Sequence, residues 1–216
     1  IRDDMVSRGL GMCIRDSLRT LIEQRPQDAF LRSVLADVLY RNQQYLDAKA
    51  ILDAVIDDQP SDGEFWIIDA VVHEKIAQTA QNRNELLTRA KTSAAQAIRL
   101  NPTVPEAFMA AAQAAEAEGD HMSAERDWRK AAELSQNPRS IFKLTAAAWR
   151  NVSQLGESNR AADALLALAE EAGQDIPEVQ LEAAVAAHLA GRLDIASELS
   201  QRLNETYRSI YLGRIR

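Results

Sequence analysis

Prolines recur along this 216-residue chain at a spacing that restricts the folds available to it. Pro60, Pro102, Pro138 and Pro177 are separated by 42, 36 and 39 residues, and each follows a long stretch with the apolar spacing of an α-helix. Proline is tolerated in the first turn of a helix, because its missing N–H would have no intrahelical partner there. A period in the high thirties has room for two helices and a turn, so the spacing predicts a row of helical hairpins.

The segment 105–138 shows the internal order of one such hairpin most clearly. Phe108 and Ala112 lie at helical spacing in its first helix, and Gly119 can adopt the positive φ with which many helices end. Trp128 then lies on the apolar face of its second helix. Trp128 and the aromatic residues of other units, Phe30 among them, are expected to fill the gaps between neighbouring hairpins. Two other segments repeat this order with their own residues, which are Ala36, Tyr45, Ala48, Leu52 and Pro60 in one and Ala184, Gly191, Leu193 and Ala196 in the other.

This order of residues resembles that of the tetratricopeptide repeat family. The resemblance covers residues 18–204 and implies an all-α fold, an α-solenoid of about five hairpins that forms a right-handed superhelix. The predicted units are 27–60, 63–102, 105–138, 139–173 and 177–204, and 205–216 is expected to start a further helix or to form a truncated tail. The second unit has about eight extra residues within 77–87, which predicts that its helices are longer than those of its neighbours.

The first residues are treated separately from the fold. The string from Val6 to Ser17 resembles a translated sequencing adaptor, and the chain begins with Ile1. We therefore expect residues 1–17 to be a non-native or disordered arm, and the chain to be a fragment of a longer repeat protein.

The resemblance also implies a binding surface, because the inward faces of the first helices in this family line a groove for a peptide or helix. The groove residues carried over by register are Asp37, Tyr40, Glu64, Ile67, Glu74, Glu106, Met109, Gln113, Glu116, Leu181 and His188. This set is acidic with apolar patches, which predicts a protein or peptide partner with basic and apolar residues. Ser33, Asp37, Glu106 and Ala110 stand where chaperone-binding members of the family clamp a C-terminal carboxylate, so we do not expect that binding mode.

Motifs for chemistry are not found in the sequence. The three histidines, His73, His121 and His188, lie in different repeats, and no HExxH, phosphate-binding loop or nucleophile motif is present. We therefore expect no enzyme activity, no cofactor and no metal site. A net charge of −7 argues against a nucleic-acid partner, and no apolar run is long enough to insert into a membrane.

The sequence thus predicts a protein–protein interaction scaffold of bacterial type. One alternative is the periplasmic repeat portion of a secretion or polysaccharide-export assembly, in which similar arrays precede a barrel or anchor. Another is the helical part of an enzyme whose catalytic domain lies outside this chain. A cytoplasmic and a periplasmic location both remain open.

Overall fold

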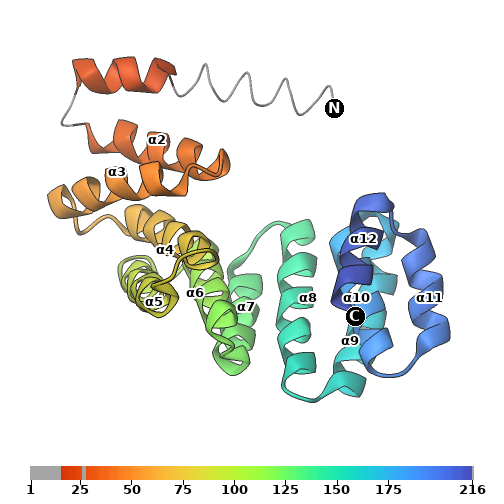
Figure 1. Ribbon diagram of the computed structural model, residues 1–216. Coiled ribbons are helices and arrows are strands. Elements are labelled where there is room, and N and C mark those ends of the chain that lie inside the picture. Colours follow the sequence, from red (N-terminus) through yellow and green to blue (C-terminus); the bar gives the residue numbers. More distant parts are fainter. Residues whose placement is uncertain (1–15, 26–27, 216) are drawn as a thin grey trace. The chain divides into compact units, whose positions relative to one another are not determined.

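A computed structural model describes residues 16–25 and 28–215 of the chain. Over these residues every regular element is helical, and no strand is present. The all-α solenoid fold that the sequence predicts is confirmed, because successive helices pair as antiparallel hairpins (Figure 1). The chain divides into two compact units, Ile1–Thr103 and Val104–Arg216, and each is described by itself.

The first unit holds two hairpins that follow a helix over residues 16–24. The hairpins consist of α2 (Ala29–Arg41), α3 (Tyr45–Asp58), α4 (Gly63–Ala77) and α5 (Arg83–Leu100). Leu39, Leu52 and Val72 are almost fully buried between these helices, and Leu18 from the preceding helix joins the same cluster. The helix over 16–24 therefore contributes to the core of this unit.

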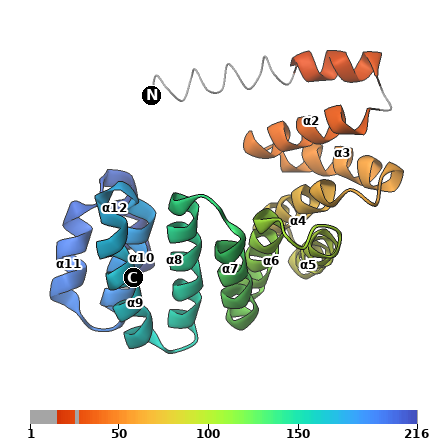
Figure 2. The same cartoon turned by 180° about the vertical axis from the view of Figure 1, so that it is seen from behind.

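The second unit holds three hairpins and a further helix. Its helices are α6 (Pro105–Glu118), α7 (His121–Leu134), α8 (Pro138–Gln154), α9 (Ser158–Ala172), α10 (Pro177–Leu189), α11 (Leu193–Arg202) and α12 (Glu205–Arg214), with a short 3₁₀ turn at Gly173–Asp175. Figure 2 shows the same succession from behind. We call the first helix of each hairpin its A helix and the second its B helix. The A helices of this unit are α6, α8 and α10, and we count α12, which follows the third hairpin, with them.

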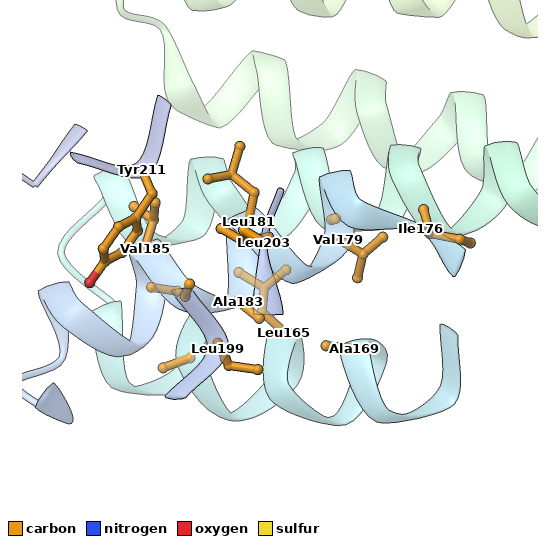
Figure 3. Close-up of a cluster of buried hydrophobic side chains, with 14 residues drawn as sticks. Leu165, Ala169, Ile176, Val179, Leu181, Ala183, Val185, Leu199, Leu203 and Tyr211 are labelled. Carbon is orange, nitrogen blue, oxygen red and sulfur yellow. The ribbon is translucent and has the colours of Figure 1, made fainter. Parts of the chain in front are cut away.

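Alanine allows the helices of the second unit to approach closely. Ala183, Ala184 and Ala187 on α10 are fully buried against the neighbouring helices. Larger side chains fill the remaining space: Leu165, Val179, Leu181, Leu203 and Tyr211 meet in one cluster (Figure 3). A second cluster surrounds Trp128, which is 6% exposed. Burial of these side chains against adjacent hairpins stabilises the row, since a single hairpin cannot cover its own apolar face.

The helix boundaries follow the local signals in the sequence. Pro138 and Pro177 each occupy the first turn of an A helix, as their spacing predicts, and Pro105 does the same in α6. Pro60 and Pro102 were expected at the same place and instead lie in the turns before α4 and α6. Side-chain oxygens of Asp120 and Asn137 accept hydrogen bonds from the first backbone N–H groups of α7 and α8. These caps satisfy N–H groups that have no partner inside the helix.

The helices differ from the sequence-based expectations in three places. Phe30 was expected to fill a gap between hairpins, and this is wrong, because its side chain is 67% exposed. In the second hairpin α5 has 18 residues and α4 has 15, so most of the extra length lies in α5. Of the arm predicted over 1–17, residues 1–15 lie outside the described residues, and 16 and 17 begin the first helix.

None of the helices in the described residues is both long and apolar enough to cross a membrane.

Candidate partner-binding surface

The A helices of the second unit are joined by a row of charged side chains. Oε1 of Glu116 on α6 accepts hydrogen bonds from Nη2 of Arg150 on α8 at 2.5 Å and from Nδ2 of Asn151 at 2.5 Å. Nε1 of Trp128 donates to the same oxygen at 2.9 Å. Glu116 is therefore held by three donors from two neighbouring helices.

The row continues across α10 to α12. Glu182 on α10 accepts one hydrogen bond from Nη1 of Arg150 at 3.0 Å and two from Arg214 on α12, both at 2.9 Å. Burial would lower the pKa of Arg150, but Glu182 and Glu116 raise it above its ordinary value. We call Glu116, Arg150, Glu182 and Arg214 the charge ladder. Because its signs alternate, each A helix is bound electrostatically to the next.

A second ionic contact lies on the same helices. Nζ of Lys143 on α8 is 2.6 Å from Oε1 of Glu178 on α10. Burial alone would raise the pKa of Glu178, but hydrogen bonds from Lys143, from its own backbone N–H and from Tyr207 hold it below its ordinary value. The negative charges of Glu116, Glu182 and Glu178 on the A helices are thus compensated by cations within the unit.

The structure places the predicted groove residues of the second unit in different environments. Glu106 is exposed at the start of α6, and Met109 and Gln113 are half-buried along the same helix. Leu181 is buried in the core. His188 is half-buried, with its ring packed edge-on against Tyr211. Glu106 is therefore the exposed member of the predicted set in this unit, and Met109, which packs against the Trp128 cluster, and Gln113 are partly accessible beside it.

The predicted residues of the first unit also divide into accessible and engaged side chains. Glu64 is exposed and Ile67 is half-buried on α4. Asp37 is bound to Arg41 at 2.7 Å on the surface of α2. The remaining two are engaged: Tyr40 packs against Tyr45 with ring centroids 5.8 Å apart, and Glu74 is buried and bonded to Lys75 and Gln78.

A serine, a histidine and an aspartate come together inside the α4–α5 hairpin. Oγ of Ser93 donates to Oδ2 of Asp69 at 2.5 Å, and Nδ1 of His73 lies 2.8 Å from the main-chain oxygen of Asp69. Nε of Arg89 reaches the same carboxylate at 3.1 Å. This is not a nucleophile triad, since a histidine base must contact the serine hydroxyl, whereas here the hydroxyl is bonded to the carboxylate.

Burial gives the same conclusion about this cluster. Asp69 and Ser93 are fully buried and His73 is 3% exposed, so a substrate could not reach them. Burial would raise the pKa of Asp69, but His73, then Ser93 and Arg89, outweigh burial and lower it. The cluster is a polar core that joins α4 to α5. Elsewhere in residues 16–25 and 28–215, histidine, cysteine and acidic side chains do not gather in a group that could hold a metal ion.

Comparison with known proteins identifies the fold. No family model matches the sequence, and no curated protein matches it. Among solved structures, a tetratricopeptide repeat protein from Parabacteroides merdae ATCC 43184 aligns with a TM-score of 0.74 at 14% identity, over 98% of this chain and 81% of that one. The thermophilic TPR protein TTC0263 from Thermus thermophilus aligns with a TM-score of 0.68 at 15% identity, over 86% and 94% of the two chains.

The chain has the fold of the tetratricopeptide repeat (TPR) proteins. A third structure of this fold is YrrB, described as a TPR protein with an unusual peptide-binding site. It aligns with a TM-score of 0.60 at 16% identity, over 87% of this chain and 91% of YrrB. The TM-scores establish the shared TPR fold. Because the identities are low, the partner of this chain has to be inferred from its own surface.

Sequence reasoning missed the charge ladder of the TPR array. Its members on successive A helices are 34, 32 and 32 residues apart, close to one repeat. Charges of alternating sign at that interval would have indicated contacts between neighbouring A helices. Glu116 was instead assigned to the groove, and Arg150 and Arg214 were not considered.

Proposed function

We propose that this chain is a TPR-type scaffold that binds a protein or peptide along the A helices of its second unit and has no catalytic role of its own. The observation that carries the proposal is the arrangement of α6, which exposes Glu106 and leaves Met109 and Gln113 half-buried beside it on a helix that the charge ladder fixes to its neighbours. A rigid surface loses less conformational entropy when it binds. The peptide-binding site described for YrrB supports the same class of function.

The chemistry of this surface favours a partner with an apolar side chain next to a basic one. Met109 offers a flexible apolar contact, and such side chains adapt to ligands of varied shape. Glu106 is exposed and provides negative charge at the same end of α6. Glu116 is already bonded to Arg150, so we assign it to the scaffold and leave it out of the contact surface.

Charge reversal tests the proposal once a ligand is in hand. A peptide selected by phage display against the whole protein supplies a ligand even while the natural partner is unidentified. Glu106→Lys should weaken its binding by about tenfold, or about 1.4 kcal/mol. The matched control is Glu171→Lys on α9, an exposed glutamate on a B helix, which should leave affinity unchanged.

One outcome of this comparison would contradict the proposal. Equal affinity of both variants and the parent for every selected peptide would show that the α6 surface is not the binding site. Circular dichroism should give the same helix content for all three proteins, since both substituted positions are exposed.

A further inference from the structure

Four turns between A and B helices share one backbone geometry, and one of them lacks glycine. The residue with positive φ is Gly119, Gly156 or Gly191 in three turns, and Gln43 with φ 61° in the fourth. In each turn the N–H of this residue donates a hydrogen bond to the carbonyl oxygen three residues earlier. In the fourth turn Gln43 donates to Tyr40 at 2.9 Å. Glycine adopts this conformation without steric cost, whereas a residue with a Cβ is strained in it.

The strained residue lines a cleft of about 560 Å³ in the first unit. One side of the cleft is formed by the α2–α3 turn and the first turn of α3. The other side is formed by the C-terminal end of α4 and the residues that follow it. The lining residues of the cleft include Gln43, Tyr45, Leu46, Asp47, Ile76 and Ala80. We call it the turn cleft. Ala80 belongs to the extra residues within 77–87, so the longer second hairpin supplies one wall.

The apolar lining of the turn cleft is accessible. Leu46 is 71% exposed although it lies in the first turn of α3, and Ile76 and Tyr45 are half-buried beside it. A pocket of a few hundred Å³ with apolar walls and a few polar groups has the size and character of a ligand site. Backbone strain at a residue that lines such a site is an observation from which a role in binding is properly inferred.

We propose that the turn cleft binds an extended peptide segment of a partner protein, with an aliphatic side chain on Leu46 and Ile76 and a neighbouring basic residue on Asp47. Of the described residues that line the cleft, Asp47 alone carries a charge. Nε2 of Gln44 lies 3.3 Å from its carboxylate. A single negative charge at an apolar cleft complements a cationic neighbour of the bound side chain. The side chain of Gln43 supplies an amide that can pair with the peptide backbone, which glycine could not do.

A titration followed by amide NMR tests this proposal on the full chain. The probe is the acetylated hexapeptide AKLLKA, with AELLEA and AKAAKA as its charge-reversed and truncated counterparts. Addition of AKLLKA should shift the amides of 43–47 and 76–80, with a Kd of about 0.1–1 mM. AELLEA and AKAAKA should each bind at least about fivefold more weakly, because one loses the charge complement and the other the aliphatic contact.

Two variants separate a binding role from a structural one. Gln43→Gly should raise the Tm by about 2–4 °C, because glycine removes the strain. The same variant should bind AKLLKA at least about threefold more weakly than the parent. Leu46→Ser should weaken it by at least about fivefold with an unchanged Tm. Leu193→Ser, at an exposed leucine in the first turn of α11, is the matched control and should leave binding unchanged.

The remaining outcomes would overturn the proposal. Parent-like affinity of both Gln43→Gly and Leu46→Ser would show that the cleft is not used. Shifts confined to α6, α8 and α10 would support the A-helix surface and reject the turn cleft. Concentration-dependent shifts of 43–47 without peptide would identify a second copy of this chain as the occupant.

Discussion

Asp69 places a carboxylate in the interior of the α4–α5 hairpin, where an unpaired charge would be unstable. Its partners are drawn from both helices, His73 from α4 and Ser93 and Arg89 from α5. The carboxylate is therefore bonded across the hairpin. Sequence reasoning gave His73 no catalytic role but did not find the cluster, since its members are separated by up to 24 residues and follow no motif.

Replacement of Asp69 by asparagine should destabilise the protein in a pH-dependent way. At neutral pH the loss should be about 1–3 kcal/mol, because Ser93 and Arg89 lose a charged acceptor. The folded-state pKa of Asp69 lies below its ordinary value, so its stabilising effect is present above a pH of about 4 and is lost as the pH falls through the folded-state pKa. The difference in unfolding free energy between parent and Asp69→Asn, measured by urea denaturation, should therefore shrink below about pH 4.

The control for this prediction is Asp57→Asn, at an exposed position near the end of α3, which should leave stability nearly unchanged at every pH. A difference between parent and Asp69→Asn that stays constant from pH 7 down to pH 3 would show that Asp69 is not held as a stabilising anion.

At the scale of the elements, the helix boundaries were the most predictable feature of the chain. Proline in the first turn of α6, α8 and α10 and glycine at the turns after α6 and α10 act locally, so one sequence suffices to place them. Side chains that depend on neighbouring helices were harder to place. Phe30 was assigned to the core from its position in the repeat, yet apolar spacing does not tell whether a neighbour covers it.

The turn after α10 provides a test at this scale. Gly191 has φ 76° with open space around its Cα, so alanine there meets backbone strain and nothing else. Gly191→Ala should cost about 1 kcal/mol. Gly213 lies in α12, also with open space around it, and Gly213→Ala should stabilise by about 0.5 kcal/mol because alanine is the better helix former.

Thermal melts of the two variants give the comparison directly. We expect a lower Tm for Gly191→Ala and an equal or higher Tm for Gly213→Ala. A higher Tm for Gly191→Ala would contradict the left-handed turn that joins α10 to α11.

At the scale of the whole molecule, repetition made the fold predictable while the binding surface remained partly hidden. The recurrence of proline and alanine predicts hairpins that pack against one another in a row. The structure confirms this fold, and the solved TPR proteins share it. The groove residues were assigned by register alone. The structure buries Leu181 and ties Glu116 into the charge ladder, because long side chains on adjacent A helices reach one another.

Methionine methyl NMR tests the proposed binding surface most directly, because the chain carries its own control. Met109 is half-buried on α6 within the proposed surface, and Met122 is 68% exposed at the start of the B helix α7. In protein labelled at the methionine methyl carbon, a peptide selected against the whole chain should shift or broaden the Met109 signal and leave Met122 unchanged. A selected peptide that binds tightly and perturbs Met122 while Met109 stays unchanged would contradict a binding site on the A helices of the second unit.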